Sequence, residues 1–345
     1  MSYNRYINNF PNESEFTKYI GGSLADVPNT ALIDDTGEMK YTKSFADYYV
    51  LYGTTSGTTD CMLGKSAEAD GPSSNDCIQV HVVAKPDGIN EMYVKQGDIL
   101  KTPTNFSYTA GFAYDKIISI SKWDIDTKWV TTMNKMFVGC SSLASLNVSK
   151  FDTSIVLDME GMFQGCSGLT SLDVSSFDTG NVTTMNRMFS GCGGLTSLDV
   201  SNFNTINVTT MERMFANCER LQYLNLNNFD THNVTNMEKM FYNCSAMYQL
   251  NIQNFDTSNV TIMDDIFAGC NNIQFLNVGE KFFNSKTILF YDFGGLINWT
   301  DSQTIDNFVS ALPDARGRSL YFSENTRNAI TEDQKNRINS KGWSY

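Results

Sequence analysis

The cysteines are the residues of this chain whose spacing first suggests chemistry. Six of its eight cysteines recur at intervals of 26 residues, at Cys140, Cys166, Cys192, Cys218, Cys244 and Cys270. Stacked chain segments would place equivalent Cα atoms about 5 Å apart, which is within disulfide range. Their side chains would point in parallel, however, and free cysteine is among the residue types most often buried. We expect structural thiols, with disulfides or metal ligation as the alternatives.

Metal chemistry has little support elsewhere in the sequence. The paired CxxC spacing of zinc sites is missing, and the chain has two histidines, His81 and His232. The recurrent aspartate of the Phe-Asp-Thr segments could form a calcium ladder, but Asn204 replaces it in one copy, so we interpret it as a turn residue. We predict no metal and no cofactor. Cys61 and Cys77 could pair with each other, and the sequence leaves their redox state open.

The sequence also lacks the signs of an enzyme. It contains no suggested Ser/His/Asp or Cys/His constellation and no glycine-rich phosphate loop after a strand, so we predict no enzymatic activity. With 25 basic and 38 acidic residues the formal net charge is −13, which argues against nucleic acid and anionic lipid as partners. No apolar run approaches about 18 residues and no signal-peptide core is visible, so we predict no membrane insertion.

Two further features of the repeats have ordinary structural explanations. The Asn-Val-Thr tripeptides that begin at positions 181, 207, 233 and 259 match the glycosylation sequon. They stand in register with the start of a predicted helix, so we interpret them as helix caps. His232 occupies a variable turn position, which the other repeats fill with Ser154, Gly180, Ile206 and Ser258. We interpret it as a solvated turn residue.

Each repeat combines two hydrophobic periodicities, as in the unit NVTTMNRMFSGCGGLTSLDVSNFNTI. Val182, Met185 and Phe189 follow the spacing of one helical stripe, and Gly191 suits the left-handed residue that ends a helix. Leu198 and Val200 then move towards the period of two that is typical of a short strand. A single coil of this kind cannot bury its apolar side alone, so we predict a stack of coils with a continuous core.

The repeat columns resemble a known family. The segment MFSGCGGLTSLDVSNFNT and its copies, from about Ile117 to Val278, look like the BspA-like leucine-rich repeat surface proteins of bacteria. The C-terminal segments at 304–312, 320–322 and 330–343 resemble the cap that follows such arrays, with a capping box at Thr331 and Gln334 and a helix end at Gly342. This resemblance implies a solenoid used for adhesion or protein binding and displayed on a surface, with no catalytic residues.

We therefore expect an α/β fold in three parts. A leucine-rich repeat solenoid, with a short strand and a short helix in each 26-residue coil, covers residues 113–283. A β-rich N-terminal domain precedes it (residues 1–112), and an α/β C-terminal cap follows it (residues 284–345). Strand-like runs at 47–52, 77–84 and 91–95 support the first assignment.

The N-terminal domain carries a second resemblance. The segment VPNTALIDDTGEMKYTK, at residues 27–43, is similar to N-terminal segments of tailed-phage virion proteins. This similarity implies an alternative function, a structural virion component docked into a larger assembly through residues 1–112. The other reading is an ordinary β-rich module or a solenoid cap. Either way we expect surface display without a visible signal peptide, on a bacterial surface or a phage virion.

Candidate binding residues flank the leucine column of the predicted strands. The first three coils carry small hydroxyl residues there, whereas the last three carry larger groups. Exposed aromatic rings beside amides suit a sugar or a polar protein surface, so we predict that this face binds a host or neighbouring-cell protein or glycan. The alternatives are that the amides satisfy neighbouring backbone groups and that the cap covers Phe275. The candidates are Tyr223, Asn225, Gln249, Asn251, Phe275 and Asn277.

Overall fold

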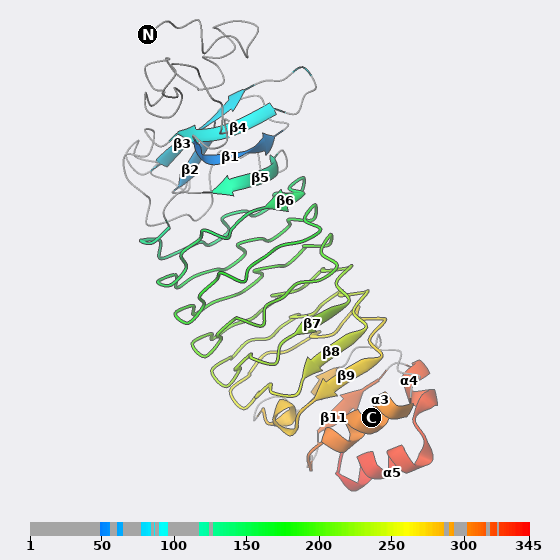
Figure 1. The fold of residues 1–345 in the computed structure, drawn as a ribbon. Helices are drawn as coiled ribbons and strands as arrows, with labels where there is room; N and C mark the ends of the chain where they lie inside the picture. Colours follow the sequence, from blue (N-terminus) through cyan, green and yellow to red (C-terminus); the bar gives the residue numbers. More distant parts are fainter. Residues whose placement is uncertain are drawn as a thin grey trace, which may run out of the picture.

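The repeats wind into a stack of coils that forms the middle of the molecule. The computed structural model describes residues 49–55, 61–64, 77–83, 86, 90–95, 117–123, 127–285, 290–292, 302–314, 318–322 and 324–345. Figure 1 shows a small sheet at one end of the stack and a group of helices at the other. The virion-like segment at 27–43 and the expected boundary at 112/113 lie outside the described residues.

The N-terminal sheet is continuous with the first coil. Its strands are β1 (Tyr49–Thr55), β2 (Cys61–Gly64), β3 (Cys77–Val83), β4 (Asn90–Lys95) and β5 (Ile117–Trp123). The order is β2-β3-β4-β1-β5-β6, in which β6 (Ser145–Leu146) is the strand of the first coil. β5 pairs antiparallel with β1 and parallel with β6, so it joins the antiparallel sheet to the parallel stack. The strands expected at 47–52, 77–84 and 91–95 overlap β1, β3 and β4.

The register of β2 and β3 separates two cysteines that the sequence left as a possible pair. Cys61 lies opposite Val80, whereas Cys77 lies opposite Gly64, three residues along the ladder. At a rise of about 3.4 Å per residue, their Cα atoms are about 10 Å apart, beyond the reach of a disulfide. The register therefore argues against a Cys61–Cys77 bridge.

The coils stack with a constant offset of one sequence repeat. The strands β7 (Tyr223–Asn225), β8 (Gln249–Ile252) and β9 (Phe275–Val278) form a parallel sheet in which Leu224, Leu250 and Leu276 are register partners. A bridge between Leu198 and Leu224 extends the same register by one coil. On a second face, consecutive bridges link Thr132 through to Ile262, and each bridge advances by one repeat. The expected strand is thus formed in the last three coils, while it is two residues long in the first coil, a single bridge at Leu198 in the third, and not formed in the second.

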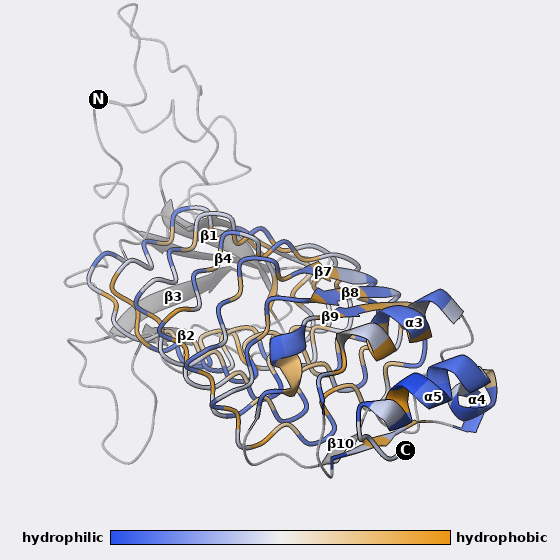
Figure 2. Ribbon diagram, turned by 90° about the horizontal axis from the view of Figure 1, so that it is seen from below, coloured by the Kyte–Doolittle hydropathy of each residue, from blue (hydrophilic) through white to orange (hydrophobic). Residues whose placement is uncertain are grey.

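Inward columns of identical residues build the core. The phenylalanines at 137, 163, 189, 215, 241 and 267 stack face to face, with successive ring centroids 5.6–5.9 Å apart and ring planes within 10°. All six are fully buried, as are the accompanying valine and cysteine columns. Burial of one such side chain contributes about 1.5–3 kcal/mol. Figure 2 shows the resulting alternation of hydrophobic and hydrophilic residues along each coil.

The short helix expected in each coil is not formed; a run of turns takes its place. In the third coil, Arg187 and Gly191 have positive φ angles of 55° and 76°, which a right-handed helix cannot contain. The N–H groups of Arg187, Phe189 and Gly191 donate to carbonyls of the next coil at 2.7–2.9 Å instead of to residues four positions back. A two-turn helix is marginal on its own, and stacking satisfies its N–H groups between coils. Gly191 is left-handed, as its sequence position predicts.

The C-terminal cap closes the far end of the stack. The last coil ends in η4 (Glu280–Phe283), and the cap comprises β10 (Phe290–Asp292), α3 (Ser302–Ala311), β11 (Ser319–Tyr321), α4 (Glu324–Ala329) and α5 (Glu332–Ser340). β10 pairs parallel with β11, and α4 and α5 are mostly hydrophilic (Figure 2). The predicted capping box is present, since Thr331 and Gln334 bond each other's backbone N–H groups. The Phe283 ring packs edge-on against Phe308 of α3 and Trp343, which anchors the cap to the last coil.

Candidate functional site

The six predicted binding residues form two adjacent rows on the parallel sheet β7–β9. Register pairs align Tyr223, Gln249 and Phe275 in one row, and Asn225, Asn251 and Asn277 in the next. Residues alternate between faces along a strand, so the buried leucines of the same strands turn these side chains outward. Five of the six are exposed and Asn251 is half-buried. The structure therefore brings all six sequence candidates together on one outward face.

The aromatic residues of this face remain accessible. Tyr223 is 58% exposed and Phe275 is 45% exposed, so the cap does not cover Phe275. The rings of Tyr248 and Phe275 pack in an edge-to-face arrangement with a centroid distance of 5.2 Å. Apolar rings on a water-facing sheet supply the contact area that recognition surfaces use. Tyr248, which is 45% exposed, is a member of this surface that the sequence reasoning missed.

A small hollow lies between the two rows and the cap. It has a volume of about 90 Å³, and four of the predicted residues line it: Gln249, Asn251, Phe275 and Asn277. The buried Leu250 and Leu276 form part of its lining, together with Asn307 of α3. Asn307 was not predicted, because only the docking of the cap against β9 brings it to the strands.

The two rows differ in how firmly their polar groups are already engaged. Asn225 and Asn251 each accept a hydrogen bond from the backbone N–H two residues further on, at 3.2 Å. Asn251 also donates to Asn227, and Asn277 donates to the side chain of Gln253. The asparagine row therefore agrees with the alternative interpretation, in which these amides satisfy polar groups of their own and neighbouring coils.

The row of Tyr223, Gln249 and Phe275 is the more available one. Among the described residues, the side chains of Tyr223 and Gln249 have no hydrogen-bond partner. In the first three coils the same positions hold Ser145, Ser171 and Ser197. The chemical change from serine to aromatic and amide groups is therefore confined to the half of the stack that adjoins the cap.

The cysteine column is interior and reduced. All six thiols are buried and free, and the five after Cys140 donate to the carbonyl of the phenylalanine 29 residues earlier, at 3.0–3.2 Å. Burial raises the pKa of Cys218 to about 12 and raises the pKa of Cys192 well above its ordinary value. A protonated thiol is neither a nucleophile nor a metal ligand, so this column is structural. In the part of the chain that the structure describes, no three potential metal-ligating side chains cluster together.

The turn segments behave largely as the Asp-Thr pattern predicts. Asp178 accepts a hydrogen bond from the N–H of Gly180 at 3.0 Å, and Asn204 accepts one from Ile206 in the same way. The asparagine of each Asn-Val-Thr tripeptide has another role than helix capping. The Asn207 amide donates to the carbonyl of Gly180 in the preceding coil at 2.7 Å, and its counterparts at 181, 233 and 259 do the same.

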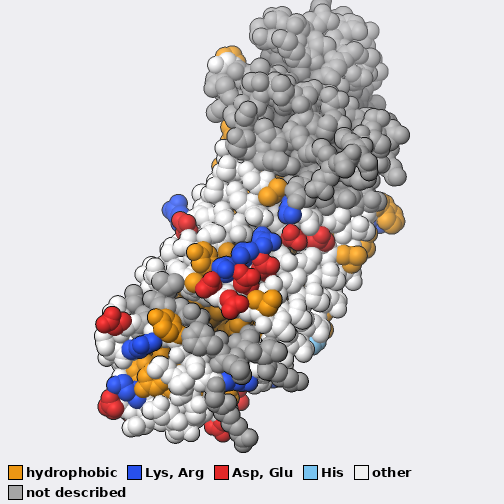
Figure 3. Space-filling view, turned by 180° about the vertical axis from the view of Figure 1, so that it is seen from behind, with side chains coloured by type: hydrophobic (Ala, Val, Ile, Leu, Met, Phe, Trp, Pro, Cys, Tyr) orange, Lys and Arg blue, Asp and Glu red, His pale blue; other side chains and the backbone are white. Residues whose placement is uncertain are grey.

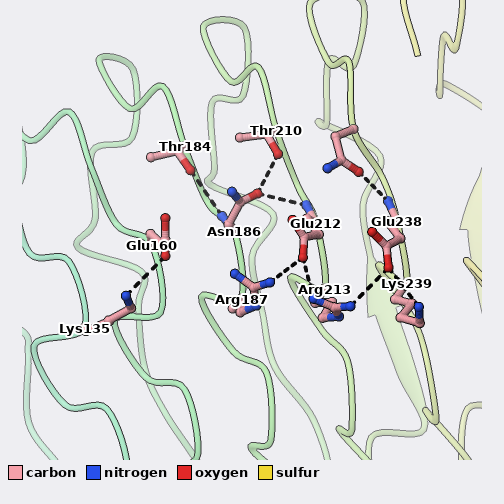
Figure 4. A network of polar contacts seen from close by, with 11 residues as sticks. Lys135, Glu160, Thr184, Asn186, Arg187, Thr210, Glu212, Arg213, Glu238 and Lys239 are labelled. Carbon is pink, nitrogen blue, oxygen red and sulfur yellow. Dashed lines mark hydrogen bonds and ion pairs between the residues drawn. The ribbon is translucent and has the colours of Figure 1, made fainter. Parts of the chain in front are cut away.

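A ladder of ion pairs runs across the coils on another face. Figure 3 shows basic and acidic side chains gathered in the middle of the face seen from behind, and Figure 4 shows their contacts. Glu212 lies between Arg187 and Arg213, and Arg213 continues to Glu238 at 3.1 Å. Lys239 binds Glu238 at 2.8 Å, so the pKa of Glu238 is lowered and that of Lys239 is raised. Because acidic and basic side chains alternate along the ladder, their charges neutralise one another. The ladder therefore links neighbouring coils and is not a charged binding surface.

Comparison with known proteins places the repeats in a family. Residues 104–220 and 173–282, two overlapping stretches that span 104–282, match the family described as "Mycoplasma protein of unknown function, DUF285". No curated protein and no solved structure matches the chain. None of the described helices is both long and apolar enough to cross a membrane.

Proposed function

This chain belongs to the repeat-containing DUF285 family, and we propose that it is a non-enzymatic binding protein of the surface-adhesin type. It recognises a protein or a glycan of a host or neighbouring cell through the outward face of β7–β9. The observation that supports this proposal is the alignment of Tyr223, Gln249 and Phe275 in one exposed row, next to the hollow that Asn307 closes. Display on a bacterial surface or a virion is part of the same proposal.

The proposal includes the finer classification of the repeats as a BspA-like leucine-rich repeat solenoid. It is supported by the offset of one repeat between paired strands and by the inward leucine column at 146, 172, 198, 224, 250 and 276. In stacked repeats of this kind, the outward strand positions of neighbouring coils form an extended recognition surface. A ligand that spans several coils would then contact one residue from each.

The test is a binding screen of the full chain against a glycan array and immobilised cell-surface protein extracts. For any partner found, the double variant Tyr223→Ala, Gln249→Ala should weaken binding at least about tenfold, because both side chains are exposed and neither hydrogen-bonds to another described residue. The matched control replaces the same positions of earlier coils, Ser171→Ala and Ser197→Ala, and should leave binding unchanged. Unaltered binding of the Tyr223/Gln249 variant would exclude this face as the recognition surface.

One observation favours the alternative role in a larger assembly. β5 hydrogen-bonds both to β1 and to the first coil. A larger assembly that bound the N-terminal domain would therefore hold the stack of coils in a fixed direction. β2 is the outer strand of the described sheet and offers an edge to a strand of another chain. This structural role predicts that the full chain forms a defined oligomer in solution, which light scattering after gel filtration would detect. A monomer at all concentrations would speak against self-assembly through this edge.

A further inference from the structure

A second concave site lies at the corner of the coils, beyond the ends of β7 and β8. It has a volume of about 480 Å³, which falls within the range of small-ligand sites, roughly 300–1,000 Å³. Three successive turns of the stack contribute to it, through Asn227 and Asn228, then Asn254, then Lys281 of η4. It shares no residue with the hollow beside Phe275.

The amides of this groove are held in fixed orientations. Asn228 Nδ2 donates to the carbonyl of Ser201, and Asn254 Nδ2 donates to the carbonyl of Asn227 at 2.7 Å. Because each amide nitrogen is anchored to the preceding coil, the position of each Oδ1 atom is fixed as well. Within the described residues neither Oδ1 atom accepts a hydrogen bond. The groove thus holds two preoriented acceptors that need a donor from outside.

Charged groups of both signs complete the lining. Asp230 Oδ1 binds the Nδ1 atom of His232 at 2.6 Å, which leaves its Oδ2 atom without a described partner. Asp256 lies in the next coil, and its carboxylate pairs with Lys281 Nζ at 3.5 Å. The side chains of Asp230 and His232 are 45% and 46% exposed, and that of Lys281 is 68% exposed, so a ligand can reach them.

This mixture of groups selects the chemistry of the ligand. An anionic ligand would meet the two carboxylates of Asp230 and Asp256, and a cationic one would meet the Lys281 ammonium group that pairs with Asp256. A neutral polyhydroxyl compound suits the lining, because each hydroxyl group can donate to an asparagine or aspartate oxygen and accept from the lysine. We propose that this corner groove is a saccharide-binding site.

The groove is specific to the last coils of the stack. At the positions of Asn227, Asn228 and His232, the second coil has Ser175, Ser176 and Gly180, and the third coil has Ser201, Asn202 and Ile206. Between the third and fourth coils the changes are therefore serine to asparagine at 227 and isoleucine to histidine at 232, while the amide at 228 is already present as Asn202. The groove is a site distinct from the strand face, and its existence does not depend on the function proposed for that face.

The experiment uses saturation-transfer difference NMR on the full chain with the methyl glycosides of glucose, galactose, mannose, fucose, N-acetylglucosamine and N-acetylgalactosamine. At least one of these probes should receive saturation from the protein. The double variant Asn228→Ser, His232→Ser should weaken that binding about tenfold, as the loss of one or two hydrogen bonds predicts. Serine occurs at both positions in other coils, as Ser176 and Ser258, so the variant should keep the melting temperature of the parent.

The matched control is Ile206→Ser, which changes the position equivalent to His232 one coil earlier and outside the groove. It should bind the glycoside as the parent does, and so should the Tyr223→Ala, Gln249→Ala variant of the strand face. The proposal is wrong if none of the six glycosides receives saturation, or if the groove variant binds as tightly as the control. It is also wrong if a triarginine peptide binds in this groove more tightly than every glycoside.

Discussion

The hydroxyl group of Thr179 makes two hydrogen bonds with the backbone of a single residue, Asn204 of the next coil. Oγ1 donates to the Asn204 carbonyl at 2.9 Å and accepts from the Asn204 N–H at 2.8 Å. The threonines at 127, 153, 205 and 231 repeat this arrangement with the residue 25 positions ahead. All of these threonines are buried, so one hydroxyl per coil satisfies a backbone donor and a backbone acceptor of the next coil from the interior side.

Replacing this hydroxyl should therefore be costly. Thr179→Val keeps the shape of the side chain but leaves the N–H and the carbonyl of Asn204 without their partner. Two part-buried hydrogen bonds are lost, and each contributes about 0.5–1.5 kcal/mol, so we expect the free energy of unfolding to fall by about 2 kcal/mol. Urea denaturation measures this difference. The control is Thr183→Val, which removes an exposed hydroxyl that only donates to Leu157 and should cost less than about 0.5 kcal/mol. Equal losses in the two variants would contradict this role of the buried column.

The threonine column illustrates what the sequence could and could not predict. The repeat interval, the inward columns and the capping box at Thr331 and Gln334 follow from local spacing, and the structure contains all of them. The Asp-Thr pair was expected to make a turn, and its aspartate does so. The residue that the threonine hydroxyl bonds lies one coil away, and the local sequence pattern carries no information about it.

The helix prediction failed for a related reason. Val182, Met185 and Phe189 do point inward, and a turn ladder shares that periodicity with a helix. The left-handed residue at position 187 is arginine, a type with no special preference for positive φ. The equivalent residue of the second coil is Gly161, which has a φ of 59°. A glycine at this position of the repeat was the available sequence signal for a left-handed residue.

The candidate binding residues could be predicted because strand alternation alone places them outward. The hollow beside them could not, because Asn307 is brought in by the cap. The corner groove also escaped prediction, since the turn residues were interpreted one coil at a time. Its signal is the change from serine to asparagine at 227, next to Asn228 and His232, which matters only once three coils are placed side by side.

Acidification should weaken the stack. Hydrogen bonds from the serine two residues further on lower the pKa of Asp152, Asp173 and Asp199 below the ordinary value of 3.8. The folded chain then binds fewer protons than the unfolded chain around this pH, so the stabilisation is complete above about pH 4 to 5 and is lost as the pH falls through the lowered pKa values. We expect the melting temperature to be constant from pH 7 to about pH 5 and to fall below pH 4.

The variant Asp173→Asn, Asp199→Asn tests the origin of this acid sensitivity. Asparagine makes the same backbone contact in other coils, as in Asn225 and Asn251, but it has no carboxylate to protonate. Its melting temperature should fall less between pH 6 and pH 3 than that of the parent. Asp314→Asn, at an exposed position outside the coils, should retain the full sensitivity. A parent-like fall in the double variant would show that other groups cause the acid effect.

The ion-pair ladder should contribute to stability in a manner that depends on salt. Glu212 has a side chain that is 16% exposed and binds both Arg187 and Arg213, the latter at 2.5 Å. Glu212→Gln would leave two neighbouring guanidinium groups without their shared counter-ion, with an expected loss of about 1 kcal/mol at low ionic strength. In about 1 M salt the Debye length falls to about 3 Å, and most of this difference should disappear.

Urea denaturation in low and high salt distinguishes this electrostatic effect from a packing effect. The control is Glu332→Gln, which removes an ion pair with Lys335 from a side chain that is 82% exposed. Exposed pairs of this kind contribute little, so this variant should stay within about 0.5 kcal/mol of the parent in both salt conditions. A loss for Glu212→Gln that is unchanged at high salt would mean that the side chain acts through packing.

The cysteine column should be inert to alkylation for as long as the stack is closed. With a pKa raised from 9.0 to about 12, Cys218 has roughly a thousandfold less thiolate at pH 8, and its burial excludes the reagent as well. Iodoacetamide should therefore modify the column cysteines only after guanidinium unfolds the chain. Mass spectrometry of the cysteine-containing peptides measures this modification. Ile206→Cys introduces a thiol at a position that is 44% exposed on the same coils, and it should react rapidly in the native protein. Labelling of Cys192 or Cys218 in the native protein at the rate of this exposed thiol would show that the coils open. A disulfide between column cysteines would contradict their interior, parallel arrangement.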